Sequence, residues 1–327
     1  MTEKCMVENT DRQLIEVLIE KTQQLLKEKQ YDQAVDVAEK AVKHAPGYED
    51  AWLVRAHTLI ATNNYQAALE ALEQALAIRS DLPQALQLKG SLLVQQGDMQ
   101  SALEVFTTIS KLDPAERMAW FSKASVLGEM GEYTQALDAL DRAIDIDPQW
   151  PETWFNRGLL LYKSKQYEDA ITAFEKAMEL VDGYIEPIYF KGLAHHELRQ
   201  EKEAQDSLYT AAEMWYMKGL FSEDGSDYQN ALAVVESALD MDVSNIDLWI
   251  LRGKLLFKLG FADDGAEVLF MTAGVCMQSD DPENALRTYD VLLELQPDNK
   301  QAWNDRGMIL EMLDRLDEAE AAFKKGE

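Results

Sequence analysis

The sequence predicts an all-α fold in which about 18 helices stack as helix–turn–helix pairs into a solenoid. One observation is a tryptophan followed three positions later by a basic residue. Trp120 and Trp154 share it at a spacing of thirty-four positions, and Trp52 lies two such periods before Trp120. A second is an alanine that keeps its place through six periods, at Ala34, Ala68, Ala102, Ala136, Ala170 and Ala204. Self-similarity at a fixed period is typical of repeat architectures, in which each unit contacts only its neighbours.

Each unit divides into two helices. Units begin at Ile15, Glu49, Pro83, Arg117, Pro151 and Ile185 without insertion. The fourth residue of a unit is large and apolar and the eleventh is leucine in five units; because they are seven apart, they share one helix face. A turn follows, marked by Asn63-Asn64, Gly97 and Gly131, which tolerate the left-handed conformation of a helix C-terminus. Small residues at positions 8, 20 and 27 let two helix axes approach closely.

This pattern resembles the tetratricopeptide repeat family, most clearly in the fifth unit through Trp154, Gly158, Tyr167, Ala170, Phe174 and Ala177. The resemblance implies a right-handed α-solenoid with a concave groove lined by the first helix of each unit. One departure is regular, since the seventh position is basic in Lys21, Arg55, Lys89, Lys123, Arg157 and Lys191. We expect these side chains to cover apolar surface with their stems and to keep their charges in solvent.

The repeat changes phase after Ala204. Trp215 restarts the pattern in a unit that begins at Ala212, twenty-seven positions after the previous start, and a full unit follows at Ile246. The next unit begins near Ala266, after only twenty positions, and the last begins at Lys300. These two spacings are shorter than the regular period of thirty-four by multiples of seven residues. Because seven residues make about two helical turns, their removal leaves every apolar face pointing in the same direction. We therefore predict two merged helices, near residues 203–221 and 262–277, each serving as the second helix of one unit and the first of the next.

These observations predict four segments. Residues 1–14 form a polar extension with an N-cap at Asn9, Thr10 or Asp11. Residues 15–184 form five regular units, 185–299 the irregular units with merged helices, and 300–327 a final unit without a capping helix. A homodimer could form through the irregular section or this uncapped end. The alternatives for the whole chain are therefore a structural homo-oligomerising module and the repeat arm of a longer protein.

Composition narrows the partners. The formal net charge of −28 argues against nucleic acid and anionic membranes, and it favours partners with basic residues. No apolar run approaches the roughly 18 residues that a transmembrane helix needs, and the acidic, polar start does not resemble a signal peptide. Cys5 and Cys276 lie in the extension and in a merged helix, so we expect no structural disulfide and a cytoplasmic location.

The resemblance places groove residues at positions 2, 5, 9 and 12 of each first helix. From the fourth unit to the ninth these positions are largely apolar and aromatic. Asn156 stands at position 6, where some family members contact peptide backbone. The predicted groove residues are Phe121, Phe155, Asn156, Tyr162, Tyr189, Tyr216, Leu220, Ile250, Phe257 and Phe270. An exposed stripe of this kind is typical of recognition surfaces; the alternative is that neighbouring first helices bury these side chains against each other.

Other sites are not supported. The subgroup that binds chaperone C-termini has Lys and Asn at positions 5 and 9, where this chain has Ile19/Gln23, Leu53/His57 and Gln87/Ser91. The adjacent His195 and His196 point about 100° apart on a helix and do not make a metal site. Residues 223–227 are acidic but lack the spacing of a calcium loop. We therefore predict no catalytic, cofactor or metal site, and a non-catalytic scaffold or adaptor that binds a partner's peptide or helix.

Overall fold

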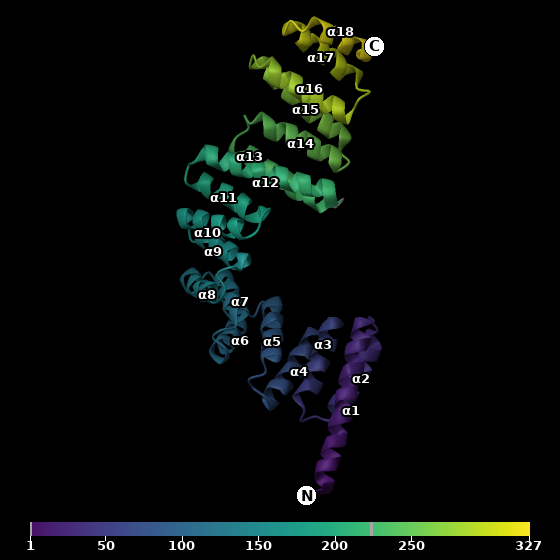
Figure 1. The fold of residues 1–327 in the computed structure, drawn as a ribbon, viewed down its shortest axis with the longest axis vertical. Helices are drawn as coiled ribbons and strands as arrows, with labels where there is room; N and C mark the ends of the chain where they lie inside the picture. Colours follow the sequence, from purple (N-terminus) through teal and green to yellow (C-terminus); the bar gives the residue numbers. More distant parts are fainter. Residues whose placement is uncertain (1, 223–224) are drawn as a thin grey trace. The chain divides into compact units, whose positions relative to one another are not determined.

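The structure is a computed structural model that describes residues 2–222 and 225–327, with side chains from residue 13 onward. Over these residues it contains 18 α-helices and no strand, which confirms the predicted fold class (Figure 1). The helices are α1 (Thr2–Lys27), α2 (Tyr31–His44), α3 (Glu49–Ala61), α4 (Tyr65–Ile78), α5 (Pro83–Gln96), α6 (Met99–Leu112), α7 (Arg117–Glu129), α8 (Tyr133–Ile146), α9 (Pro151–Lys163), α10 (Tyr167–Leu180), α11 (Ile185–Glu197), α12 (Glu201–Ser222), α13 (Gly225–Met241), α14 (Ile246–Lys258), α15 (Ala262–Gln278), α16 (Pro282–Leu295), α17 (Lys300–Met312) and α18 (Leu316–Gly326).

The first helices α3, α5, α7, α9, α11, α14 and α17 begin at the predicted unit starts. The turn that follows has the same geometry in nine repeats. The residue at position 15 of each of these repeats has a positive φ. These residues are Lys29, Asn63, Gly97, Gly131, Lys165, Arg199, Gly260, Asp280 and Asp314. Only three of these are glycine, so the hairpin enforces the left-handed conformation even where the side chain disfavours it.

The first helix, α1, begins at Thr2 rather than after an N-cap at Asn9, Thr10 or Asp11, so that prediction is wrong. Residues 2–14 contain neither glycine nor proline. Once the helix has formed over the first repeat, the polar segment offers no residue that stops its propagation toward the N-terminus.

Contacts divide the chain into two compact units, residues 1–160 and 161–327, with the division inside α9. Each compact unit has its own core, built from small residues of one helix packed against large residues of the next. A Cβ atom added at Gly90 would lie 2.6 Å from the ring of Phe106, and one at Gly192 would lie 2.9 Å from Leu208. The small eighth position therefore sets the close approach of the two helices in a hairpin.

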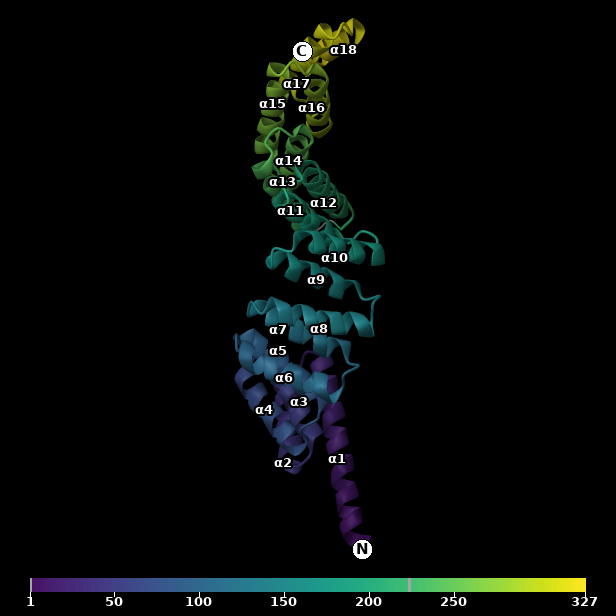
Figure 2. The ribbon, with the colours of Figure 1, turned by 90° about the vertical axis from the view of Figure 1, so that its left-hand side faces the viewer.

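The two helices at the shortened periods are long, as predicted. They are α12 and α15, with 22 and 17 residues against 13 or 14 in the regular helices α3–α11. Helices α1 and α13, with 26 and 17 residues, also exceed the regular helices. α12 packs against both α11 and α13, and α15 against both α14 and α16. α14 also packs against α12 and α16, so these three share one layer. Figure 2 shows α11, α13 and α15 toward one edge of the ribbon and α12 and α16 toward the other.

Each merged helix therefore moves the following first helix into the other layer. After α12, the first helix α14 packs against α12 and α16 and therefore lies in their layer. Successive helices alternate between the two layers, and each merger removes one helix from the series. The second merger, at α15, therefore moves the next first helix, α17, back to the original layer. The fold of the second compact unit thus contains two switches of layer that cancel.

The regular basic seventh position has a structural explanation. Its charge pairs with a carboxylate sixteen positions earlier, on the second helix of the preceding repeat, in Lys89–Glu73, Arg157–Asp141, Lys191–Glu175, Arg252–Glu236 and Arg306–Asp290. In several repeats the same cation lies over the tryptophan three positions before it, as Arg252 does at 5.4 Å from the Trp249 ring. We call this arrangement the inter-repeat ladder.

The tryptophans of the ladder are also anchored by their indole nitrogens. Each Nε1 donates to the carbonyl oxygen six positions earlier, over distances of 2.8–3.0 Å, in Trp52, Trp120, Trp154, Trp249 and Trp303. In four of these the acceptor belongs to a proline that closes the preceding repeat. The tryptophan therefore ties the loop between two repeats to the first helix of the second one.

Candidate functional site

In the compact unit of residues 1–160, the predicted groove residues Phe121, Phe155 and Asn156 are half-buried. The ring of Phe121 packs against Trp150, with centroids 4.7 Å apart. The amide nitrogen of Asn156 donates to the carbonyl of Glu152 in its own helix over 2.8 Å, so this donor is engaged within the chain. At least two of the three side chains thus contribute to internal packing or hydrogen bonding.

In the compact unit of residues 161–327, the predicted aromatic residues pair with other rings of the chain. Tyr162 lies 6.4 Å from Phe190 and Tyr189 lies 5.2 Å from the same ring. Tyr216 packs on Tyr228 and Phe270 on Tyr289, with centroids 5.9 and 5.7 Å apart. Burial raises the pKa of Tyr162 and of Tyr216 above the usual tyrosine value, which fits rings that are partly removed from water.

Of the three remaining predictions, Leu220 on α12 is 39% exposed, and Phe257 on α14 lies against Gly265 of α15. Ile250 is only 3% exposed and belongs to a core cluster with residues of α15, α16 and α17. Its assignment to a binding surface is wrong. The physical reason is the change of layer, because α16 packs alongside α14 and covers the position that would line a groove in a regular repeat.

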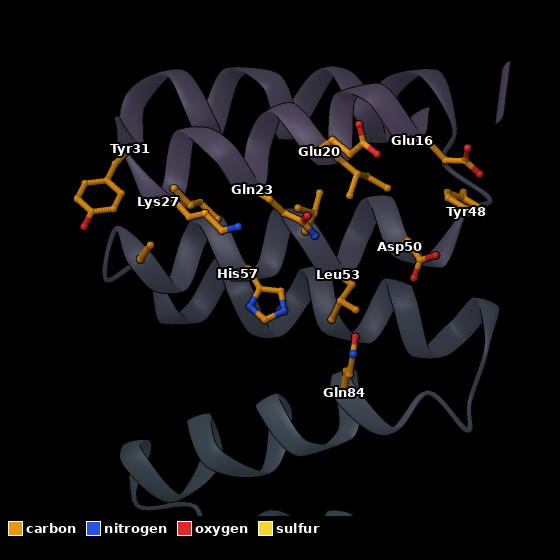
Figure 3. Close-up of a pocket in the computed structure, with 14 residues that line it drawn as sticks. Glu16, Glu20, Gln23, Lys27, Tyr31, Tyr48, Asp50, Leu53, His57 and Gln84 are labelled. Atoms are coloured by element: carbon orange, nitrogen blue, oxygen red, sulfur yellow. The ribbon is translucent and has the colours of Figure 1, made fainter. Parts of the chain in front are cut away.

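A different cavity, of about 720 Å³, lies between α1, α3 and α5 (Figure 3). It is larger than the cavity of about 530 Å³ among α16, α17 and α18. Its lining comes mainly from the groove positions of the first three repeats and from the start of α2: Glu16, Ile19, Glu20, Gln23, Leu26, Lys27, Tyr31, Tyr48, Asp50, Leu53, Val54, His57, Ala61 and Gln84. We call this cavity the N-terminal groove.

Charge in the N-terminal groove is unevenly distributed. Figure 3 shows Glu16, Glu20 and Asp50 toward one end and Lys27 toward the other. The stretch between them is apolar or neutral and includes Leu53 and His57. Three carboxylates from two helices at one end create a region of negative potential beside an apolar surface, which favours a cationic group attached to an apolar segment.

The His57 side chain is exposed to solvent, and partial desolvation by the groove lowers the pKa of its imidazole below the usual histidine value, which favours the neutral ring. A neutral imidazole offers one donor and one acceptor to a bound peptide and does not oppose the negative end of the groove. Gln23 from α1 and Gln84 from α5 add amide groups to the same lining. The groove therefore combines an apolar base with neutral hydrogen-bonding groups along its length.

The sequence did not single out the N-terminal groove as the binding surface. The resemblance places Ile19, Leu53 and His57 at groove positions, but the predicted recognition surface extends only from the fourth unit to the ninth. The signal that could have identified the groove was the acidic second position of the first two repeats, Glu16 and Asp50. That signal is weak in a chain with 59 acidic residues, because only the tertiary structure selects which of them converge.

The histidine pair has a structural role. His195 Nδ1 lies 2.6 Å from Gln200 Oε1, and His196 Nδ1 lies 3.0 Å from Glu201 Oε2. Both interactions connect α11 with the turn and start of α12. Among the described side chains there is no group of three or more His, Cys, Asp or Glu residues that could hold a metal ion.

The predicted acidic loop at residues 223–227 lies partly outside the described residues. Within it, Asp227 is buried at the start of α13 and accepts from Ser222 Oγ over 2.6 Å, and it pairs with Lys218 over 3.2 Å. Cys276 is buried and free, and Cys5 lies outside the described side chains. None of the helices in the described part of the chain is long and apolar enough to cross a membrane.

Comparison with protein families agrees with this architecture. Models described as tetratricopeptide repeat match residues 25–92, 151–184 and 277–327, and one described as TPR repeat matches 124–165. A model for anaphase-promoting complex, cyclosome, subunit 3 matches residues 62–143. The chain belongs to the tetratricopeptide repeat family.

Individual relatives are distant. The photosystem I assembly protein Ycf3 of Prochlorococcus marinus (strain NATL1A) is 28% identical over 111 residues, which cover 34% of this chain. The chain spans about half (54%) of the length of that curated relative.

Among solved structures, the C-terminal part of a TPR repeat-containing protein from Cytophaga hutchinsonii has a TM-score of 0.55 at 16% identity. The match covers 87% of this chain and 97% of that one. PilF of Pseudomonas aeruginosa has a TM-score of 0.53 at 18% identity, covering 68% of this chain and 99% of the other. These likenesses establish the fold.

Proposed function

We propose that the chain is a non-catalytic interaction scaffold whose N-terminal groove binds an extended peptide segment of a partner protein. The observation that carries the proposal is the cavity of about 720 Å³ lined by the groove positions of three consecutive first helices. Family membership supports the class of function, because solenoids of stacked repeats present extended surfaces suited to protein binding. The aromatic residues predicted from the sequence contribute largely to packing, so they are secondary in this proposal.

The chemistry of the groove specifies the peptide. An apolar side chain would lie against Ile19 and Leu26, which line the cavity and are partly exposed, and a lysine or arginine would reach the end that holds Glu20 and Asp50. Complementary charge of this kind increases the association rate and selects against acidic competitors. The net charge of −28 acts in the same direction over longer distances.

The test uses labelled peptides of alternating leucine and lysine, with prolines that prevent helix formation, against the same peptides with glutamate in place of lysine. Fluorescence anisotropy should show binding of the lysine peptide only. The variant Glu20→Lys/Asp50→Lys should weaken binding on the order of ten-fold, about 1.4 kcal/mol. Asp138→Lys, an exposed acid on α8, is the matched control and should bind like the wild type. Equal binding by the double variant would contradict the proposal.

The pH dependence provides a second measurement. Since the pKa of His57 is lowered in the folded chain, acid protonates the imidazole only below the usual histidine range, and the protonated ring opposes a cationic peptide. We expect binding to weaken as pH falls into that region. His57→Gln should remove this part of the pH profile while the charge preference persists.

A further inference from the structure

A second surface lies on the two merged helices. On α15, Met271 and Val275 are 63% and 56% exposed. On α12, Met217 and Phe221 are 48% and 84% exposed. The two pairs are fifty-four positions apart in sequence and occupy positions 6 and 10 of the repeats that begin at Ala212 and Ala266, so both merged helices display the same feature.

The tenth position is covered in the regular repeats. The tenth-position residues Leu92, Val126 and Leu160 are at most 7% exposed. Leu160 shows which element covers the tenth position. It belongs to a core cluster with residues of α7 and α8, which form the hairpin of the preceding repeat. In a regular repeat, position 10 is thus part of the interface with the preceding pair of helices.

In a merged helix this interface cannot form. The N-terminal half of the helix takes the place of the preceding second helix, and a continuous helix cannot fold back over its own C-terminal half. The uncovered residues keep the apolar character and the i, i+4 spacing of a helix–helix interface. The exposed patch therefore has the chemistry of a contact from which one helix is missing.

Charge determines the kind of helix that fits. On α15 the exposed stripe continues toward the N-terminus through Glu267 and Asp264, and the helix contains no Lys, Arg or His. On α12 the equivalent residue is Glu213, which accepts from the Tyr209 hydroxyl over 2.8 Å. A second copy of the chain would place acids against acids, whereas a helix with basic residues beside an apolar face is complementary.

We propose that the two merged-helix stripes, Glu213/Met217/Phe221 on α12 and Glu267/Met271/Val275 on α15, each dock a basic amphipathic helix of a partner protein in place of the missing repeat helix. Flexible methionine side chains suit such a surface, because they adapt to the apolar face of different helices. Helix-in-groove docking with anchors at i and i+4 is an established mode of recognition. The stripes share no residue with the N-terminal groove, so this binding does not depend on peptide capture there.

The probe is a helical peptide of about 18 residues, five turns, with leucines on one face and lysines beside them. Its counterpart carries glutamate in place of lysine. We expect the lysine peptide to bind and the glutamate peptide not to bind. In the variant Met217→Glu/Met271→Glu the affinity should fall on the order of ten-fold or more, since charge replaces central apolar anchors. Thermal unfolding should be unchanged, because both side chains are exposed in the free protein.

Met312→Glu is the matched control, since Met312 on α17 is 65% exposed and lies outside the two stripes. NMR of methyl-labelled methionine gives a direct location: the Met217 and Met271 signals should shift on peptide addition and the Met312 signal should not. Unchanged affinity in the double variant, unshifted Met217 and Met271 signals, or equal binding of the glutamate peptide would each overturn the proposal. Concentration-dependent self-association that the double variant abolishes would overturn it in favour of a second copy.

Discussion

The regular repeats and the merged helices use the same repeat positions with opposite results. In α5 and α7 the tenth position holds buried Leu92 and Val126, and in α15 it holds Val275, which is more than half exposed. These residues do not differ in polarity. The difference is one neighbouring helix, present in the regular repeats and absent at each merger, so burial in a repeat protein is decided by the neighbour and not by the side chain alone.

The inter-repeat ladder differs between the two regions in the same way. In regular repeats the seventh-position cation pairs with an exposed acid of the preceding repeat, as in Lys191–Glu175. In α12 the residue sixteen positions before Lys218 is Lys202, and Lys218 pairs instead with the buried Asp227 of the following helix. In α15 the seventh position is Thr272, which is buried. The ladder thus disappears where the preceding second helix is not a separate element.

The largest expected effect tests the comparison at position 10. Leu92→Ala should lower the free energy of unfolding by about 2–5 kcal/mol, because it leaves a cavity in the core of α3–α6. Val275→Ala should change it by less than about 0.5 kcal/mol, since the side chain is exposed. Urea unfolding followed by circular dichroism measures both. Similar losses in the two variants would mean that Val275 is covered in solution.

The second prediction compares the two kinds of ion pair. Asp227→Ala should cost about 1–3 kcal/mol, because it removes a buried acceptor of both Ser222 and Lys218. Glu175→Ala removes an exposed partner of Lys191 and should cost at most about 1 kcal/mol. High salt should shrink the second loss and leave the first almost unchanged. A larger loss for Glu175→Ala would reverse our ranking of the two pairs.

The third prediction concerns the feature on which the two regions agree, the left-handed fifteenth position. Lys165→Gly in the turn after α9 should stabilise the chain by about 0.5–1 kcal/mol, since glycine adopts a positive φ without the steric cost of a side chain. Asp280→Gly in the turn after the merged helix α15 should give a smaller gain, because aspartate tolerates this conformation better than lysine. Thermal melts compare them, and destabilisation in both would show that the conformational argument fails.

The smallest expected effect comes from a gap in the ladder. Lys123 has the regular seventh-position cation, but the residue sixteen positions before it is Thr107, which offers no charge. Thr107→Glu should add an exposed ion pair like Lys89–Glu73 and stabilise the chain by about 0.2–1 kcal/mol. Thr107→Gln is the uncharged control. An equal change in the two variants would assign the effect to helix propensity instead of charge.

Much of the fold was predictable because the period is carried by residues that act locally or between neighbours. The tryptophans, the small eighth residues and the alanines located the hairpins, and the two shortened periods located α12 and α15 to within two positions at each end. The prediction failed at Ile250, because it placed every first helix in one layer. The layer in which a helix lies depends on how many helices precede that helix in the chain. No single repeat contains this information.

The candidate site was less predictable. Phe121, Tyr189 and Tyr216 have the residue types of a recognition surface, yet their rings pack against other rings of the chain. Glu20 and Asp50 are ordinary surface acids in the sequence and converge only when α1 and α3 lie side by side. Aromatic side chains serve packing and binding equally well, so residue type alone does not separate the two roles.

The sequence by itself determined the helical hairpins, their period, the two mergers and the acidic character, since each follows from residue spacing or composition. Only the tertiary structure decided which faces are covered, where a cavity opens and which acids lie together. The physical reason is that periodicity acts within a helix or between adjacent helices, whereas exposure depends on whether another helix is present to exclude water from a given face.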